Sequence, residues 1–268
     1  MKNTLYILFI SLLFISCSDF QKALKSEDIA AKFEMGTELY EAEKWSKAHR
    51  LFAQIVPNYR GKPQAEKLMF MYAMTSYKMR DYFIAGYQFE RFVTGYPTSE
   101  KVEEASFLAA KSYYELSPVY SKEQKETIEA IEKLQIFINT YPNSQYLAES
   151  NTMIQELDFK LEKKAFSIAS QYNKISDYKA SVKSFNNFLL DFPGSKLRKE
   201  AMFQRFEAAY NLAILSIKSL KEERINTALS YFEAFKKSYA QDDYISIGET
   251  MKNDLLQELE QLNTEVNN

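Results

Sequence analysis

Beyond residue 17 the apolar residues recur at spacings of three and four, which is the period of an amphipathic helix. Before it, residues 5–15 form an apolar run that only Ser11 interrupts. The 268 residues include only six glycines and six prolines, so turns are few and helices are expected to be long. The pattern predicts an all-α protein behind a short apolar leader.

Two signatures repeat along this helical region. The first reads Phe-x-x-small-x-x-x-Tyr and occurs three times, each copy 37 residues after the last. Its copies are Phe33-Gly36-Tyr40, Phe70-Ala73-Tyr77 and Phe107-Ala110-Tyr114. A fixed displacement of this length indicates an array of structural repeats.

The second signature reads small-x-x-x-Phe-x-x-aromatic-aliphatic-x-x-aromatic-Pro, with leucine in the phenylalanine place of one copy. Complete copies span 85–97, 130–142 and 181–193, and weaker copies without the proline begin at Ala48 and Ala228. A serine follows each proline by two residues, at Ser99, Ser144 and Ser195. Proline ends a helix and serine is a preferred N-cap, so we expect each serine to cap the next helix.

The order of the two signatures resembles the tetratricopeptide repeat, in which helix A and helix B meet at a pair of small residues. The pairs Gly36–Ala48, Ala73–Ala85 and Ala169–Ser181 are each 12 residues apart, as in that family. Two pairs are wider, with 20 residues from Ala110 to Ala130 and 19 from Ala209 to Ala228, which indicates longer loops or extended helices.

We therefore predict a tetratricopeptide superhelix of five repeats. The expected repeats lie near 28–61, 62–98, 99–143, 144–194 and 195–241, and residues 242–268 would form a capping helix and a polar tail. A terminal cap is expected because the last repeat cannot bury its own apolar face.

In the tetratricopeptide pattern, certain A-helix positions line a concave groove. The residues at those positions, which we predict to bind peptide, are Phe33, Tyr40, Phe70, Met74, Tyr77, Phe107, Lys111 and Tyr114. Aromatic rings offer contact area at a low cost in rotamer entropy, methionine adapts its shape, and Lys111 or Lys78 would meet a terminal carboxylate. An aromatic stripe at helical spacing also fits a packed core, so both interpretations stay open.

The leader has the features of an export signal: Lys2 supplies a positive charge, the apolar run follows, and Ser16 precedes Cys17. The stretch Phe14-Ile15-Ser16-Cys17 resembles a bacterial lipobox. The resemblance implies a signal peptide over 1–16, acylation of Cys17, and a lipid-anchored tether over 17–27. Ser18 stands where an aspartate would retain some lipoproteins in the inner membrane. The alternative is a free thiol in an uncleaved anchor.

The composition argues against several kinds of functional site. The single cysteine excludes an intramolecular disulfide, and a lone histidine, His49, argues against a His-based zinc site or a Ser/His or Cys/His catalytic site. We expect His49 to be a solvated helix residue. The formal net charge of −2 gives no indication of a nucleic-acid partner. No acidic pair has catalytic spacing, so we expect no enzyme activity, cofactor or metal.

A lipobox followed by five divergent repeats resembles the BamD (YfiO) family of lipoproteins, which belong to the outer-membrane β-barrel assembly machinery. The resemblance implies a periplasm-facing scaffold held at the outer membrane only by its lipid. Its C-terminal repeats would dock on the barrel subunit BamA beside other assembly lipoproteins. Its N-terminal repeats would receive the C-terminal signals of unfolded outer-membrane proteins.

Three alternatives remain. One is a tetratricopeptide adaptor lipoprotein of another envelope complex. Another is a helical-repeat nutrient-binding lipoprotein, although such proteins usually carry large loop insertions that this sequence lacks. An enzyme on a repeat platform is disfavoured because the predicted repeats fill the chain.

Overall fold

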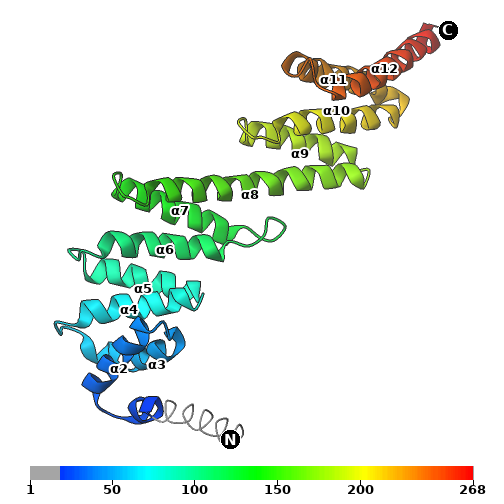
Figure 1. Ribbon diagram of the computed structural model, residues 1–268. Coiled ribbons are helices and arrows are strands. Elements are labelled where there is room, and N and C mark those ends of the chain that lie inside the picture. Colours follow the sequence, from blue (N-terminus) through cyan, green and yellow to red (C-terminus); the bar gives the residue numbers. More distant parts are fainter. Residues whose placement is uncertain (1–18, 268) are drawn as a thin grey trace, which may run out of the picture. The chain divides into compact units, whose positions relative to one another are not determined.

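The computed structural model describes residues 19–267, with side chains to Thr264. Cys17 and the predicted signal peptide lie outside the described residues. Within the described part the regular elements are α-helices and one 3₁₀ helix, with no strand (Figure 1). The all-α class predicted from the sequence is confirmed. None of the described helices combines the length and apolar character that crossing a bilayer requires.

Helices follow one another with short connections. After a short helix over residues 19–25, the elements are α2 (Ile29–Glu41), α3 (Trp45–Ile55), η1 (Val56–Tyr59), α4 (Ala65–Lys78), α5 (Tyr82–Gly95), α6 (Val102–Leu116), α7 (Lys125–Thr140), α8 (Leu147–Lys174), α9 (Tyr178–Asp191), α10 (Arg198–Ile214), α11 (Lys218–Ser238) and α12 (Tyr244–Asn267). The chain divides into two compact units: unit 1 runs to Pro118 and includes Glu123–Leu157, and unit 2 comprises Val119–Lys122 and the residues from Asp158 onward.

In unit 1, successive helices run in alternating directions and pack as the pairs α2–α3, α4–α5 and α6–α7 (Figure 1). The small residues predicted to join the pairs are buried. Ala48, Ala73, Ala85 and Ala130 have no exposed surface and Ala110 has 2%. Gly36 faces the ring of Phe52, which is itself fully buried. The predicted tetratricopeptide packing of helix A on helix B is therefore present in this unit.

Unit 2 repeats the arrangement with α8–α9 and α10–α11. Ala169 and Ser181 are fully buried, and the Ser181 hydroxyl donates a 2.9 Å hydrogen bond to the Ala169 carbonyl oxygen. A helix stands where the capping helix is predicted: α12 packs on α10 and α11, with Leu255 fully buried among their side chains. Tyr244 at its start stacks on Phe203 at a ring-centroid distance of 4.3 Å.

The tight turns inside the pairs adopt a left-handed conformation. Glu43, Arg80 and Ser176 have φ angles of 56°, 62° and 63°. In two of these turns the following aspartate caps helix B, because Asp81 accepts from the Ile84 N–H and Asp177 from the Ala180 N–H.

The two wide small-residue pairs have different structural causes. The third repeat has a loop between Leu116 and Lys125, whereas in the fifth both helices are extended.

The fourth repeat has an A helix longer than the repeat pattern predicts. The 28 residues of α8 form one helix, and the boundary between the units falls within it. In unit 1, Met153 and Leu157 are buried against α6 and α7. In unit 2, Phe166 and Ala169 pack against α9. The first half of α8 thus closes the core of the third repeat.

The prediction that Ser99, Ser144 and Ser195 are N-caps is wrong in detail, since each lies ahead of the helix start. Each hydroxyl oxygen instead accepts a 3.0 Å hydrogen bond from the N–H two residues later. Each hydroxyl also donates to a glutamate of the preceding A helix, at 2.5 Å to Glu66, 2.6 Å to Glu103 and 2.5 Å to Glu162. These bonds join successive repeats. After the fifth repeat Asp242 takes the serine place and pairs with Lys199 at 2.9 Å.

The segment predicted to be a tether is partly packed on the repeats. Residues 19–25 are helical, and Phe20 and Ala23 are buried against Leu51 of α3. Lys47 and Arg50 each lie 5.4 Å from the centre of the Phe20 ring. The described chain therefore meets the first repeat only a few residues after Cys17 in the sequence.

Gly36→Ala should destabilise the protein because its new methyl carbon would lie 2.6 Å from a ring carbon of Phe52. Overpacking of this kind costs about 1–3 kcal/mol, which exceeds the helix-propensity gain of about 1 kcal/mol. Thermal unfolding followed by circular dichroism should show a lowered midpoint. Gly95→Ala is the matched control because its methyl would meet no atom within 4 Å. A Gly36→Ala midpoint equal to that of the control would contradict the close helix contact.

Candidate functional site

The predicted groove residues lie on α2, α4 and α6, the three A helices of unit 1. Neighbouring helices bring several of them together. Tyr40 of α2 and Phe70 of α4 line one pocket, and the charge of Lys111 on α6 acts on Tyr77 of α4. These interactions link neighbouring A helices, although the predicted groove residues differ in how much surface they expose.

The phenylalanine positions are packed against helix B or the loop that follows it. Phe33 stacks on Tyr59 at 5.2 Å, and Phe70 meets Phe92 edge-on at 5.5 Å. Phe107 is only 3% exposed and stacks on Tyr146 at 4.2 Å. Met74 is 9% exposed. In this conformation Phe107 and Met74 belong to the core, whereas Phe33 and Phe70 keep part of their surface open.

The tyrosine positions are half-buried, and two of them also contact helix B: Tyr40 meets Trp45 edge-on at 5.2 Å, and Tyr77 meets Tyr82 edge-on at 5.5 Å. Burial raises the pKa of Tyr40 and of Tyr77. Tyr114 donates a hydrogen bond to Glu156, and this bond, with burial and the glutamate charge, raises the pKa of Tyr114 to about 12. All three rings therefore stay neutral at physiological pH and offer aromatic surface with a hydroxyl.

The positive charge of Lys111 is already balanced by a glutamate of α8. Its ammonium lies 2.6 Å from a carboxylate oxygen of Glu149. Burial lowers the pKa of Lys111, but the hydrogen bond to Glu149 and nearby negative groups outweigh burial and raise it. Lys78 lies 5.7 Å from the Trp45 ring. Neither lysine is among the side chains that line the pocket between α2 and α4.

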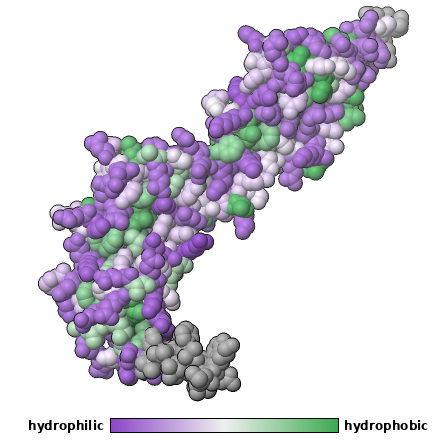
Figure 2. All heavy atoms as spheres, viewed as in Figure 1, coloured by the Kyte–Doolittle hydropathy of each residue, from purple (hydrophilic) through white to green (hydrophobic). Residues whose placement is uncertain are grey.

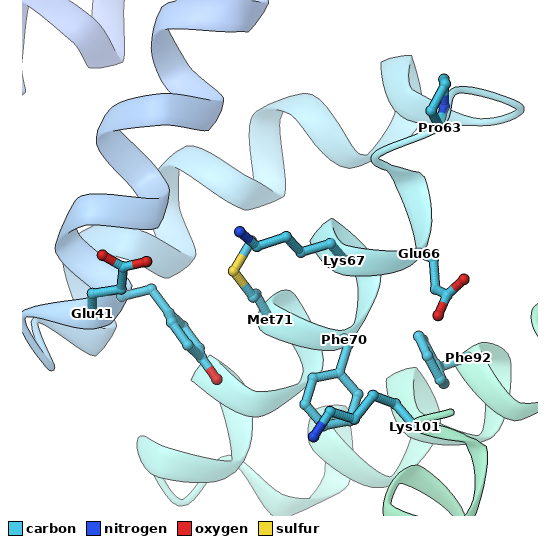
Figure 3. Close-up of a pocket in the computed structure, with 9 residues that line it drawn as sticks. Glu41, Pro63, Glu66, Lys67, Phe70, Met71, Phe92 and Lys101 are labelled. Carbon is cyan, nitrogen blue, oxygen red and sulfur yellow. The ribbon is translucent and has the colours of Figure 1, made fainter. Parts of the chain in front are cut away.

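This pocket has a volume of 470 Å³ (Figure 3). Its apolar lining comes from Tyr40, Phe70, Met71 and Phe92, and its charged lining from Glu41, Glu66, Lys67 and Lys101. Of the two carboxylates, that of Glu66 already accepts a hydrogen bond from the Ser99 hydroxyl. The pocket combines an aromatic floor with a rim of mixed charge, which suits an apolar side chain attached to a polar backbone.

The rim cations differ in their partners. Lys101 pairs with Glu104 at 2.8 Å and lies 5.5 Å from the Phe70 ring. Hydrogen bonding to Glu104 raises the pKa of Lys101 despite some burial. Lys67 makes no ion pair or hydrogen bond with any residue that the structure describes. The repeat signatures do not include Lys67, yet it precedes Phe70 by three residues and so shares a helix face with it.

His49, which we expected to be a solvated helix residue, is half-buried against α4. Its ring stacks on Tyr72 at 4.8 Å, and Nδ1 lies 3.1 Å from the Thr75 hydroxyl. Burial lowers the pKa of His49, and the charge of Asp81 offsets this only in part. Among the described residues, no group of His, Cys, Asp and Glu is arranged to hold a metal ion.

Helix pairs joined at buried small residues define this chain as a tetratricopeptide-type helical repeat protein. A family model described as YfiO, outer membrane lipoprotein, matches residues 26–223, which is well over half of the chain. The chain therefore belongs to this family, as the sequence signatures predicted.

Several curated relatives carry the name outer membrane protein assembly factor BamD, among them proteins from Caulobacter vibrioides and Rickettsia prowazekii. The protein from Caulobacter vibrioides is 21% identical over 182 residues, which cover 68% of this chain and 60% of that protein. The protein from Rickettsia prowazekii is 23% identical over 186 residues, which cover 69% of this chain and 74% of that protein. The match thus spans less than two thirds of the Caulobacter protein.

Proposed function

We propose that this chain is a non-enzymatic scaffold lipoprotein of outer-membrane β-barrel protein assembly. Membership of the outer membrane lipoprotein family and the similarity to two BamD proteins support this role. In this proposal a lipid on Cys17 holds the chain at the outer membrane, facing the periplasm. Its partners are a BamA-type barrel subunit, other assembly lipoproteins and unfolded outer-membrane proteins.

The proposal that the chain binds unfolded outer-membrane proteins, its clients, rests on the pocket between α2 and α4. An aromatic residue at the end of a client chain would lie against Tyr40 and Phe70, the aromatic lining residues that keep exposed surface. The rim lysines would meet the terminal carboxylate, and Lys67 is the better placed of the two because it has no partner within the described chain. A charge-assisted hydrogen bond of this kind is stronger than a neutral one.

The aromatic stripe would extend this site along the preceding residues of the client. Tyr77 on α4 and Tyr114 on α6 remain half-exposed, and their rings suit alternate side chains of an extended peptide. Phe107 and Met74 would support these tyrosines from beneath. Lys111 would contribute through its methylene chain, since its ammonium is paired with Glu149.

Lys67→Gln tests the assignment of the terminal carboxylate. The full-length protein should bind a labelled peptide ending in phenylalanine more tightly as the free acid than as the C-terminal amide, by about tenfold. Lys67→Gln should remove most of this difference, as measured by fluorescence anisotropy. The control Lys78→Gln should keep it, because Lys78 does not line the pocket. Equal affinity of the wild-type protein for acid and amide would contradict the assignment.

Cys17→Ser tests the membrane anchor. The substituted chain should incorporate no labelled palmitate and should leave the membrane fraction or accumulate as precursor. Its helical circular dichroism should equal that of the wild type, because the repeats lie outside the leader. A Cys17→Ser protein that is still processed and still membrane-bound would refute lipid anchoring at this residue.

A further inference from the structure

A second pocket in unit 1 lies between η1, α4 and the end of α5. It has a volume of 360 Å³ and shares no lining residue with the pocket between α2 and α4. Its α4 residues, Ala65 and Met69, lie on the side of that helix away from Lys67 and Phe70, given 3.6 residues per turn. The second pocket therefore opens on the other face of the first two repeats.

Two arginines, Arg60 and Arg91, line this pocket, and neither has a carboxylate partner among the described residues. The Arg91 guanidinium lies 5.7 Å from the centre of the Tyr87 ring. Asp28 acts on the pocket residue Tyr59 through its charge, but its carboxylate already caps α2 by accepting from two backbone N–H groups. The pocket thus presents two guanidinium groups that no carboxylate of residues 19–264 neutralises.

The remaining walls are apolar and held in place by the repeat core. Tyr59 is 7% exposed and stacks on Phe33. Tyr96 packs on the fully buried Phe92 at 5.2 Å. Met69 and Val56 complete the apolar lining. Rigid walls of this kind lower the ordering cost of binding.

The first repeat ends differently from those that carry the proline–serine turn, and this difference shapes the pocket. The chain leaves η1 through Arg60 and Gly61. Gly61 has a φ of 77°, in the left-handed region that favours glycine. Gly95 lies on the opposite rim at the end of α5. An added Cβ at Gly61 or Gly95 would meet no atom within 4 Å, so the rim is open at both places.

We propose that this pocket binds an acidic peptide segment of a partner protein. One apolar side chain of the segment would enter the pocket, and a flanking aspartate or glutamate on each side would pair with Arg60 and Arg91. The planar guanidinium matches a carboxylate through two parallel hydrogen bonds. A free phosphate would meet the arginines but would leave the apolar walls uncovered, so the lining favours a peptide.

The test uses full-length protein and fluorescein-labelled pentapeptides of the form Glu-Asp-X-Asp-Glu, where X is Leu, Met, Phe or Tyr. Each peptide has a C-terminal amide, so it lacks the terminal carboxylate on which the client site depends. Neutral counterparts carry Gln and Asn in place of Glu and Asp. Anisotropy should show at least one acidic peptide binding about tenfold more tightly than its neutral counterpart.

Two pairs of variants locate the binding. The double variant Arg60→Gln and Arg91→Gln should weaken the acidic peptide about tenfold, whereas Arg50→Gln, an exposed arginine outside the pocket, should not. Gly95→Leu should block the pocket without loss of the thermal midpoint, because its side chain enters open space. Gly194→Leu is the control, since that glycine also faces open space but lies in unit 2.

The proposal is overturned if no acidic peptide shows arginine-dependent binding, or if Gly95→Leu binds as tightly as Gly194→Leu. It is also overturned if only inorganic phosphate or phosphatidylglycerol vesicles bind through the two arginines. Lys67→Gln should leave this binding unchanged. The acidic-peptide site and the proposed client site can therefore fail independently.

Discussion

The fold depends on the close approach of two helices at a pair of small residues in each repeat. Gly36, Ala73, Ala110, Ala169 and Ala209 stand on the A helices, and the alanine or serine opposite each is fully buried. Because these positions lack bulk, the helices approach closely enough for neighbouring phenylalanines to close the core. The direct Ser181–Ala169 hydrogen bond shows how near the backbones come.

The same constraint decides what each face of the first repeats offers. Phenylalanines of the B helices, such as Phe89 and Phe92, occupy the space beside the small residues and leave no exposed surface. The A-helix tyrosines are then only half covered, and a pocket forms beside Phe70. The turn after the first repeat departs from the proline–serine pattern and opens a second pocket lined by Arg60 and Arg91. Packing thus produces two chemically different surfaces in one unit.

Much of this could be predicted from the sequence because it is local and periodic. The small-residue pairs and the helix-ending prolines follow from spacing alone. Periodicity does not reveal which neighbour a face meets, so it could not separate the buried Phe107 from the half-exposed Tyr114. The docking of Phe20 and the double role of α8 also depend on contacts between segments that the repeat pattern treats as separate.

The proposed scaffold role in outer-membrane protein assembly rests on the family and on the similarity to BamD proteins. Affinity purification of the tagged full-length chain from detergent-solubilised membranes of its own organism tests this claim most directly. The account predicts that a BamA-type barrel subunit is recovered with it in comparable molar amount and remains bound through stringent washing. Recovery of a different envelope complex, with the barrel subunit absent, would contradict it.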